Sequence, residues 1–347
     1  MGSGSLIRTL IVDDSAFVRK VVREILSRSP FIEVVGMARD GEEALAQVEE
    51  LNPDVVTCDL QMPRMGGVEF VRRQMEKRPV PILVLTASPE DGEQVLQALE
   101  AGAVDMVKKP SALANDELLA IRDELVGKVK AAARAPVEKL KATKAEGKLP
   151  PVLAKAAARV DVVLIGVSTG GPQALRHLLP QFPADFPVPI AIVLHMPVGY
   201  TALFAEKLND ICKVPVKEAQ DGDLLQNGHV TVAQAGRHLV LRRSAAGNVL
   251  AQLVNHPMDK PHRPSVDVLF QSAAEVFRSR VLGVVMTGMG DDGKQGAAWV
   301  KAQGGTILTE SEESCVIYGM PRAVVEAGLS DGSYPLNLMA ENIAKRL

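Results

Sequence analysis

The sequence is poor in cysteine, in long apolar runs and in basic tracts, and each shortage excludes a class of protein. Its three cysteines are scattered through 347 residues without the spacing of a metal site, which favours a reducing compartment over a disulfide framework. No apolar run approaches the roughly 20 residues needed to span a bilayer. A net charge of −3 and the absence of a basic tract give no reason to expect nucleic acid as a partner.

The first residues lack the features of an export signal. Residues 1–5, MGSGS, have neither the charged nor the apolar region of a secretory signal peptide. Apolar residues at 47% and charged residues at 23% are typical of a globular protein, and a chain of this length suits two domains. We therefore expect a cytoplasmic monomer with no membrane insertion and no nucleic-acid partner.

Short apolar runs alternate with amphipathic patterns from Leu6 to about Val126. The expected strands are LIRTLIV, FIEVVGMA, PDVVTCD, PILVLTAS and AVDMVKK. Apolar residues at helical spacing lie between these runs. Such alternation predicts a parallel sheet with right-handed crossovers and a functional site at the carboxyl ends of its strands.

Residues 126–157 have a different composition. They are rich in alanine and lysine, contain no aromatic residue, and are interrupted by Pro136, Pro150 and Pro151. This composition favours a solvated, partly helical linker over a packed core. The sequence therefore predicts a first domain at residues 6–125 and a second at residues 158–347.

The alternation resumes at Val160. The expected strands are VDVVLIGV, PIAIVLHM, SRVLGVVMTGMG and GGTILTE. Residues 228–254, GHVTVAQAGRHLVLRRSAAGNVLAQLV, carry Gly and Asn where hairpins turn. We expect a second doubly wound α/β domain, with a mainly parallel sheet and an added antiparallel hairpin region.

Acidic side chains follow two strands of the first predicted sheet. Asp13 and Asp14 come after the first strand, and Asp59 ends the third. Strand-end aspartates are often turn formers or helix caps, but three together resist joint ionisation unless a cation lies among them. Mg²⁺ prefers such oxygen ligands. With Lys109 and Thr86 at later strand ends, an aspartate here is a suitable phosphoryl acceptor.

The motifs VDDS, CDLQMP, LTAS and KKP, in this order, resemble the response-regulator receiver domain over residues 6–125. The resemblance implies a flavodoxin-like doubly wound fold with Asp59 as phosphoacceptor. It implies that Mg²⁺ is bound directly by Asp14, Asp59 and the Gln61 carbonyl, and by Asp13 through a water molecule. It also implies that Thr86 and Lys109 contact the phosphoryl oxygens. One departure is Met106, three residues before Lys109, where receivers often carry an aromatic residue.

The stretch GVSTGGP places Ser168 between an expected strand and an expected helix. Gly166 and Gly170 complete a G-x-S-x-G pattern around it, and the helix N-terminus offers free N–H groups to an anion. The serine could cap the helix, bind a nucleotide phosphate or act as a nucleophile. A nucleotide site would need G-x-G-x-x-G with a following acidic residue, or a P-loop lysine, and the sequence has neither here.

A nucleophilic serine needs a base and an acidic residue that orients the base. His195 directly follows the expected strand PIAIVL, so it should lie at the same sheet edge as Ser168. Asp291 and Asp292 follow another such strand in a glycine-rich loop. The order Ser, His, Asp along the chain argues against the α/β-hydrolase fold. The less well placed histidines are His177, His229, His238, His256 and His262.

The motifs GVSTGGP, HMPVGYTALFAEKLN, HRPSVDVLF and TGMGDDG resemble the catalytic domain of bacterial chemotaxis protein-glutamate methylesterases over residues 158–347. The resemblance implies a triad of Ser168, His195 and Asp292, with the backbone N–H of Met289 directed at the developing oxyanion. Asp291 adds a second carboxylate beside Asp292. The implied activity is phosphorylation-regulated hydrolysis of glutamate methyl esters on chemoreceptors with release of methanol, together with deamidation of receptor glutamines.

The implied partners are the methylated cytoplasmic helices of chemoreceptors, as substrate, and a chemotaxis histidine kinase, as phosphodonor. The esterase reaction itself implies no cofactor. One alternative is a docking module whose second domain is catalytically idle, but the intact Ser, His and Asp set disfavours it. A DNA-binding output is a weaker alternative, because no basic recognition helix follows the linker.

Overall fold

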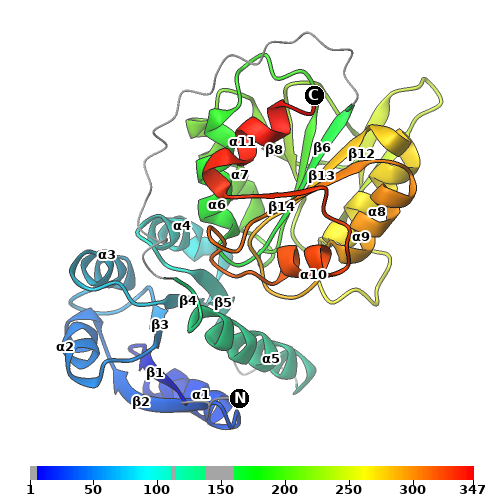
Figure 1. The fold of residues 1–347 in the computed structure, drawn as a ribbon. Helices are drawn as coiled ribbons and strands as arrows, with labels where there is room; N and C mark the ends of the chain where they lie inside the picture. Colours follow the sequence, from blue (N-terminus) through cyan, green and yellow to red (C-terminus); the bar gives the residue numbers. More distant parts are fainter. Residues whose placement is uncertain (1–5, 111–114, 137–159) are drawn as a thin grey trace. The chain divides into compact units, whose positions relative to one another are not determined.

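The computed structural model describes residues 6–110, 115–136 and 160–347, and the chain divides into two compact units, Met1–Thr143 and Lys144–Leu347 (Figure 1). Most of the predicted linker, residues 137–157, lies outside the described residues. Its first residues are helical, because one helix, α5 (Asn115–Ala132), continues past residue 125. The domain boundaries drawn from the sequence stay predictions.

The first unit is a five-stranded parallel sheet in the order β2-β1-β3-β4-β5, which confirms the predicted flavodoxin-like fold. Helices α1 and α5 pack side by side, as do α2 and α3, and α3 and α4. The elements are β1 (Ile7–Val12), α1 (Ala16–Ser27), β2 (Ile32–Ala38), α2 (Gly41–Leu51), β3 (Val55–Asp59), α3 (Gly67–Lys77), β4 (Ile82–Thr86), α4 (Gly92–Glu100), β5 (Asp105–Lys108) and α5.

The order of strands in the first unit explains where Asp13 and Asp59 lie. The central strands β3 and β4 are buried along their whole length, as expected for parallel strands with both faces covered. Chain order reverses between β1 and β3, which are neighbours in the sheet. A doubly wound sheet leaves a crevice at such a switch point, beyond the carboxyl ends of the strands. Asp13 and Asp59 lie at this crevice.

The second unit contains a seven-stranded sheet in the order β15-β14-β13-β6-β7-β10-β8 and a three-stranded sheet in the order β11-β12-β9. Its elements are β6 (Val162–Val167), α6 (Gly171–Leu178), β7 (Ile190–Leu194), α7 (Thr201–Ile211), β8 (Val216–Glu218), β9 (Asp223–Leu224), β10 (Val230–Val232), β11 (His238–Arg243), β12 (Val249–Val254), α8 (Val266–Phe277), β13 (Val281–Val285), α9 (Lys294–Ala302), β14 (Thr306–Glu310), α10 (Met320–Glu326), β15 (Gly332–Tyr334) and α11 (Leu336–Ala344).

The larger sheet is parallel throughout, and helices cover both of its faces. Figure 1 shows α6, α7 and α11 on one face and α8 and α9 on the other. Chain order again reverses at β6, which lies between β13 and β7. The carboxyl ends of β6, β7 and β13 therefore share one edge, and each is followed by a residue that the sequence analysis selected. The predicted fold of the second unit is confirmed.

The hairpin prediction for residues 228–254 is right for β11 and β12, which pair antiparallel. It is wrong for β10, which lies between β7 and β8 and runs parallel to both. All three residues of β10 are buried. A short β-branched segment that is buried on both faces belongs inside a parallel sheet. The positions of the glycine and asparagine residues in the sequence do not show that β10 is buried on both faces.

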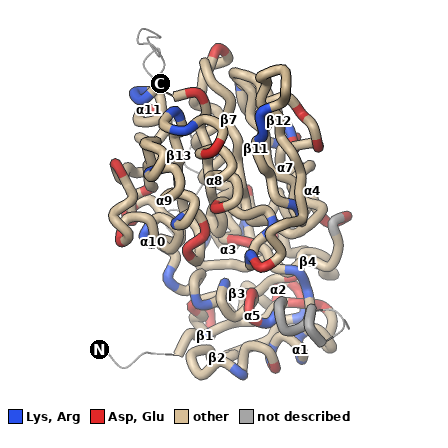
Figure 2. The backbone as a smooth tube through the Cα atoms, turned by 90° about the vertical axis from the view of Figure 1, so that its right-hand side faces the viewer, with Lys and Arg blue, Asp and Glu red and all other residues tan. Residues whose placement is uncertain are grey.

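Charged residues of both signs are interspersed over each unit (Figure 2), in keeping with 42 acidic and 39 basic residues in the sequence. Among the described residues, no helix has the length and apolar character needed to cross a bilayer.

Candidate functional sites

Three carboxylates meet at the strand ends of the first unit. Ligand oxygens of Asp13, Asp14 and Asp59 all lie within 4.8 Å of one another, with Asp13 and Asp59 buried and Asp14 exposed. Lys109 Nζ lies 3.0 Å from Asp13 Oδ2 and 2.7 Å from Asp59 Oδ2. The structure thus brings together the acidic residues and the lysine that the sequence placed at separate strand ends.

Burial governs the electrostatics of this cluster. It raises the pKa of Asp59, and the charge of Asp13 adds to the rise, while the hydrogen bond and charge of Lys109 oppose it. For Lys109, burial acts to lower the pKa, but the hydrogen bonds and charges of Asp59 and Asp13 outweigh it, so the net shift is upward. One ammonium therefore faces two buried carboxylates, with the exposed Asp14 as a third acidic group nearby.

The donor set fits a divalent cation. Asp13 Oδ2 is buried, and the ammonium of Lys109 lies 3.0 Å from it. Hard oxygen ligands with an excess of negative charge are what Mg²⁺ requires. Gln61 belongs to the same crevice, because its backbone N–H donates to Asp59 Oδ1 at 3.2 Å.

Thr86 lies at the end of β4, next to β3, and Met106 lies on β5, the edge strand beside β4. The Thr86 carbonyl accepts the Lys109 N–H at 2.7 Å, which fixes the strand end that carries the lysine. The Thr86 hydroxyl lies 3.3 Å from both the Ser88 carbonyl and Asp91 Oδ2. Met106 is buried on β5 opposite Val84, so it is a core residue here.

In the second unit, Ser168 lies directly after β6 and is 8% exposed. Its backbone N–H donates to the Thr287 carbonyl at 3.0 Å, which ties it to the loop after β13. Two glycines allow the close approach. A Cβ on Gly288 would come within 2.8 Å of Ser168 Cβ, and Gly170 has φ +78° and would meet Val316 at 2.6 Å. Within the G-x-S-x-G pattern, Gly170 is therefore required by crowding at this turn, whereas a Cβ on Gly166 would meet the side chain of Val266.

His195 follows β7, the neighbouring strand. Its backbone N–H donates to the Val167 carbonyl at 3.1 Å, and its Nε2 lies 2.8 Å from Asp292 Oδ2. A carboxylate at Nε2 favours the tautomer with the proton there, which leaves Nδ1 as an acceptor. Nδ1 is buried and has no hydrogen-bond partner among the described residues. Ser168 and His195 share the sheet edge, but no hydrogen bond joins their side chains.

Asp292 is fixed at the N-terminus of α8. Its Oδ1 accepts from Ser265 Oγ at 2.8 Å and from the Asp267 N–H at 3.0 Å, and its Oδ2 accepts from the Val266 N–H at 2.7 Å. Burial acts to raise the pKa of Asp292, but the hydrogen bond and charge of His195 and the two backbone N–H groups hold it well below its usual value. Asp292 is therefore anionic at neutral pH.

The structure distinguishes the two adjacent aspartates. The side chain of Asp291 is 70% exposed and forms an ion pair with Lys294 at 3.2 Å, whereas that of Asp292 is 8% exposed and contacts His195. The preference for Asp292, drawn from the resemblance, agrees with this geometry.

The loop that carries Met289 is held by a buried carboxylate. Glu310, which is fully buried at the end of β14, accepts the Thr287 N–H through Oε2 at 2.9 Å. The Thr287 hydroxyl donates to the Thr169 carbonyl at 2.9 Å and accepts the Ile317 N–H at 3.0 Å. This network orders the segment from Thr287 to Met289 next to Ser168. Within the described residues, no hydrogen bond uses the Met289 N–H.

Sequence reasoning missed several contacts of this site. The rings of His262 and His195 stack with centroids 4.2 Å apart, although His262 was ranked among the less well placed histidines. Ser265 and Asp267 were not selected at all. All three lie in or beside the motif HRPSVDVLF, which was the one signal that could have pointed to them.

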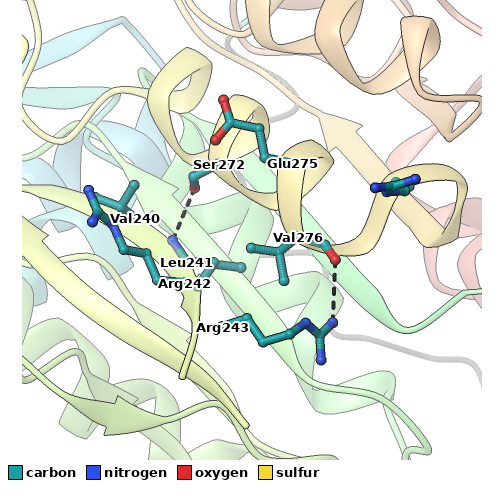
Figure 3. Close-up of a pocket in the computed structure, with 8 residues that line it drawn as sticks. Val240, Leu241, Arg242, Arg243, Ser272, Glu275 and Val276 are labelled. Atoms are coloured by element: carbon teal, nitrogen blue, oxygen red, sulfur yellow. Dashed lines mark hydrogen bonds between the residues drawn. The ribbon is translucent and has the colours of Figure 1, made fainter. Parts of the chain in front are cut away.

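A pocket of the second unit lies between β11 and the C-terminal half of α8, away from these strand ends. Leu241 N–H donates to Ser272 Oγ at 3.0 Å, and Arg243 Nη2 donates to the Val276 carbonyl at 3.3 Å (Figure 3). None of the predicted site residues lines it. Its contacts fasten α8, the helix whose other end holds Asp292.

A flavodoxin-like domain with an acidic crevice, followed by a parallel α/β domain with polar residues at its strand ends, defines a response regulator with an enzymatic output domain. Comparison with known families bears this out. The family "Response regulator receiver domain" matches residues 9–121, and "CheB methylesterase" matches residues 163–343. The chain therefore belongs to the CheB methylesterase family of enzymes and carries a receiver domain.

Individual relatives agree. A Myxococcus xanthus protein named protein-glutamate methylesterase/protein-glutamine glutaminase 5 is 50% identical over 340 residues, which is 96% of each chain. A Geobacillus kaustophilus protein of the same name, without the number, is 43% identical over 343 residues, which is 98% of each. The crystal structure of the Thermotoga maritima CheB methylesterase catalytic domain matches with a TM-score of 0.53 and 39% identity, over 54% of this chain and 99% of that one.

Proposed function

We propose that the second unit hydrolyses methyl esters of glutamate side chains on chemoreceptors, with release of methanol, and that it also deamidates receptor glutamines. The observation that carries the proposal is the partly buried hydrogen bond between His195 and Asp292 at the sheet edge that also bears Ser168. The names of the relatives support the same substrate chemistry. The direct test is methanol release from methylated receptor membranes by the purified chain.

In the proposed reaction, Ser168 Oγ attacks the ester carbonyl and His195 Nδ1 takes the hydroxyl proton. The Met289 N–H donates to the oxyanion of the tetrahedral intermediate. When the tetrahedral intermediate collapses, the bond between the carbonyl carbon and the methoxy oxygen breaks. The methoxy group takes the proton from His195 and leaves as methanol. Water, deprotonated by His195, then cleaves the glutamyl ester of Ser168 and restores the serine. With a glutamine substrate the leaving group is ammonia.

Asp292 supports this cycle electrostatically. Its carboxylate is buried and anionic, so it stabilises the imidazolium that forms whenever His195 holds the extra proton. Three hydrogen bonds from the start of α8 prevent it from turning away. The positive end of that helix further favours the negative charge.

Asp292→Asn should therefore lower the rate of methanol release by about 10³- to 10⁴-fold, because an amide holds the imidazole in the wrong tautomer. Asp291→Asn is the matched control and should stay within about twofold of the parent chain, because Asp291 is exposed and pairs with Lys294. Initial rates on methylated receptor membranes measure both. Equal losses in the two variants would contradict the assignment of Asp292.

We further propose that Asp59 is the phosphoacceptor of the first unit and that a chemotaxis histidine kinase is its phosphodonor. Asp13, Asp14, Asp59 and the Gln61 carbonyl would hold Mg²⁺, and the contacts of the acidic cluster support this assignment. When bound, the ion neutralises charge on the phosphoryl group. Lys109 would pair with the phosphoryl oxygens, and Thr86 would donate its hydroxyl to them.

Phosphorylation should raise the esterase activity of the whole chain, since a charge change at Asp59 can shift the population of receiver conformations. A small phosphodonor such as acetyl phosphate, added with Mg²⁺, is expected to increase methanol release several-fold. A fragment of residues 158–347 should give the same rate with and without the phosphodonor. Stimulation of this fragment would show that the effect does not pass through the receiver.

A further inference from the structure

Asp267, the second residue of α8, is a buried carboxylate that the reaction above does not use. Its exposed fraction is 7%. Asp267 Oδ1 accepts the Gly293 N–H at 2.9 Å and the Gly296 N–H at 2.8 Å. Gly293 directly follows Asp292 along the chain and precedes α9. Asp267 therefore holds the start of α9 and the loop that carries Asp292.

The contact is reciprocal. Asp292 accepts the N–H groups of Val266 and Asp267 at the start of α8, while Asp267 accepts N–H groups at the start of α9. Asp292, which lies before α9, therefore accepts hydrogen bonds from the free N–H groups of α8. Asp267, which lies in α8, accepts hydrogen bonds from N–H groups at the start of α9. We refer to this arrangement of Asp267 and Asp292 as the crossed caps. Asp292 cannot move relative to α8 without breaking bonds on both sides.

A glycine makes the crossed caps possible. Helices α8 and α9 pack against each other, and a Cβ on Gly296 would lie 2.6 Å from Phe270 Cβ and 2.9 Å from Asp267 Cα. Real Cβ atoms do not approach so closely, so a side chain at position 296 would push the helices apart. The sequence therefore provides both the carboxylate and the space that lets it reach the α9 backbone.

Lys260 balances the second buried carboxylate. Its Nζ lies 3.0 Å from Asp267 Oδ2 and 2.9 Å from Gln295 Oε1. Without this ammonium, Asp267 and Asp292 would be two like charges in one buried region. Lys260 also lies two residues before His262, whose ring stacks on His195. The same ion pair therefore anchors the loop that covers the imidazole.

We propose that Asp267 is a positioning residue of the esterase site, which acts through Asp292 and the 291–296 segment to hold His195 in its reactive orientation. This inference rests on the proposed function, because it assumes that the pair of Asp292 and His195 activates Ser168. It goes beyond that function because it assigns the positioning of Asp292 and His195 to Asp267, which is not a member of the triad. A displacement of about 1 Å in such a pair can cost about 100-fold in rate.

The test uses the whole chain and a fluorophosphonate probe, which needs no receptor. Ser168 Oγ bonds to phosphorus, the P–F bond breaks, fluoride leaves, and the hydroxyl proton passes to His195. The variants are Asp267→Ala, which removes the acceptor, Asp267→Glu, which keeps the charge but displaces it, and Asp267→Asn, whose side-chain oxygen can still accept both N–H groups. Methanol release from receptor membranes gives kcat and KM for each.

Asp267→Ala and Asp267→Glu should label about 10- to 100-fold more slowly and lose kcat by a similar factor, with KM within about twofold. Asp267→Asn should stay within about fivefold of the parent chain. The matched control is Asp223→Ala, which removes a carboxylate that also accepts a backbone N–H, from Gln220, and pairs with a lysine, Lys217. It should label at the parent rate.

Thermal melting separates positioning from folding. If Asp267→Ala does not fold, the comparison of Asp267→Glu with Asp267→Asn decides the question. Folded Ala or Glu variants that label at the parent rate would overturn the inference and leave Asp267 as a helix cap only. An Asn variant as slow as a folded Ala variant would also overturn it. If the parent chain is not labelled at Ser168, the proposed function itself fails, which is a distinct result.

Discussion

Replacing Ser168 by alanine is expected to lower methanol release from methylated receptor by about 10⁶-fold, the loss typical when the nucleophile of a serine hydrolase is removed. The hydroxyl is the only group deleted, and in the described part of the chain it makes no hydrogen bond that the fold would lose. Ser168 is held instead by its backbone, through the bond from its N–H to Thr287. The loss should therefore be one of chemistry, with the thermal midpoint close to that of the parent chain.

Two measurements make this result specific. Phosphorylation of the receiver by acetyl phosphate should be unchanged in Ser168→Ala, which shows that the first unit is intact. Ser279→Ala is the matched control, because Ser279 is exposed in a short turn after α8, and it should release methanol at the parent rate. If Ser168→Ala retains near-normal activity, the nucleophile must be sought elsewhere on the sheet edge.

The positions of both sites could be predicted because both depend on strand ends. Alternating strands and helices imply parallel sheets, and the carboxyl ends of parallel strands share one edge. Asp13 and Asp59 therefore had to lie close together, as did Ser168 and His195. The geometry followed from the pattern of apolar runs, which is the strongest signal in a single sequence.

Contacts that depend on loops could not be predicted in the same way. Residues 255–264 lie between β12 and α8 and have no periodic pattern, so the spacing of apolar residues did not indicate that His262 would stack on His195. The resemblance selected Asp292 over Asp291, but the physical reason for that choice needed the structure, because it depends on which carboxylate turns toward the start of α8. Asp267 was missed because an aspartate near a helix start is ordinarily a local cap, whereas this one caps a different helix.

β10 shows a further limit of pattern reasoning. Its three residues, Val230–Val232, lie near glycines and an asparagine that suggest a hairpin, but they are inserted between β7 and β8. A three-residue strand is too short to show the continuous apolar run of a buried parallel strand or the alternation of a half-buried one. Its place is decided by burial on both faces, which is a property of the assembled sheet.

Asp59→Asn is expected to abolish phosphorylation of the chain by acetyl phosphate, because the neutral amide cannot attack phosphorus as the carboxylate does. The variant should fold normally. Burial raises the pKa of Asp59 in the folded chain. The free energy of unfolding therefore falls as the pH rises through that pKa and the carboxyl becomes charged. The neutral side chain of asparagine avoids this loss of stability at neutral pH. The thermal midpoint at pH 7 should accordingly be no lower than that of the parent chain.

The same variant separates the two activities of the chain. Methanol release without phosphodonor should match the parent rate, whereas the stimulation by acetyl phosphate should disappear. Asp54→Asn is the matched control. Asp54 accepts the Arg8 N–H at 2.8 Å and lies just before β3, at the opposite end of that strand from Asp59. This variant should be phosphorylated at Asp59 and stimulated by acetyl phosphate as the parent chain is. If radiolabelled acetyl phosphate still transfers its phosphoryl group to Asp59→Asn, the acceptor is another residue, and Asp13, which shares Lys109 with Asp59, is the first to examine.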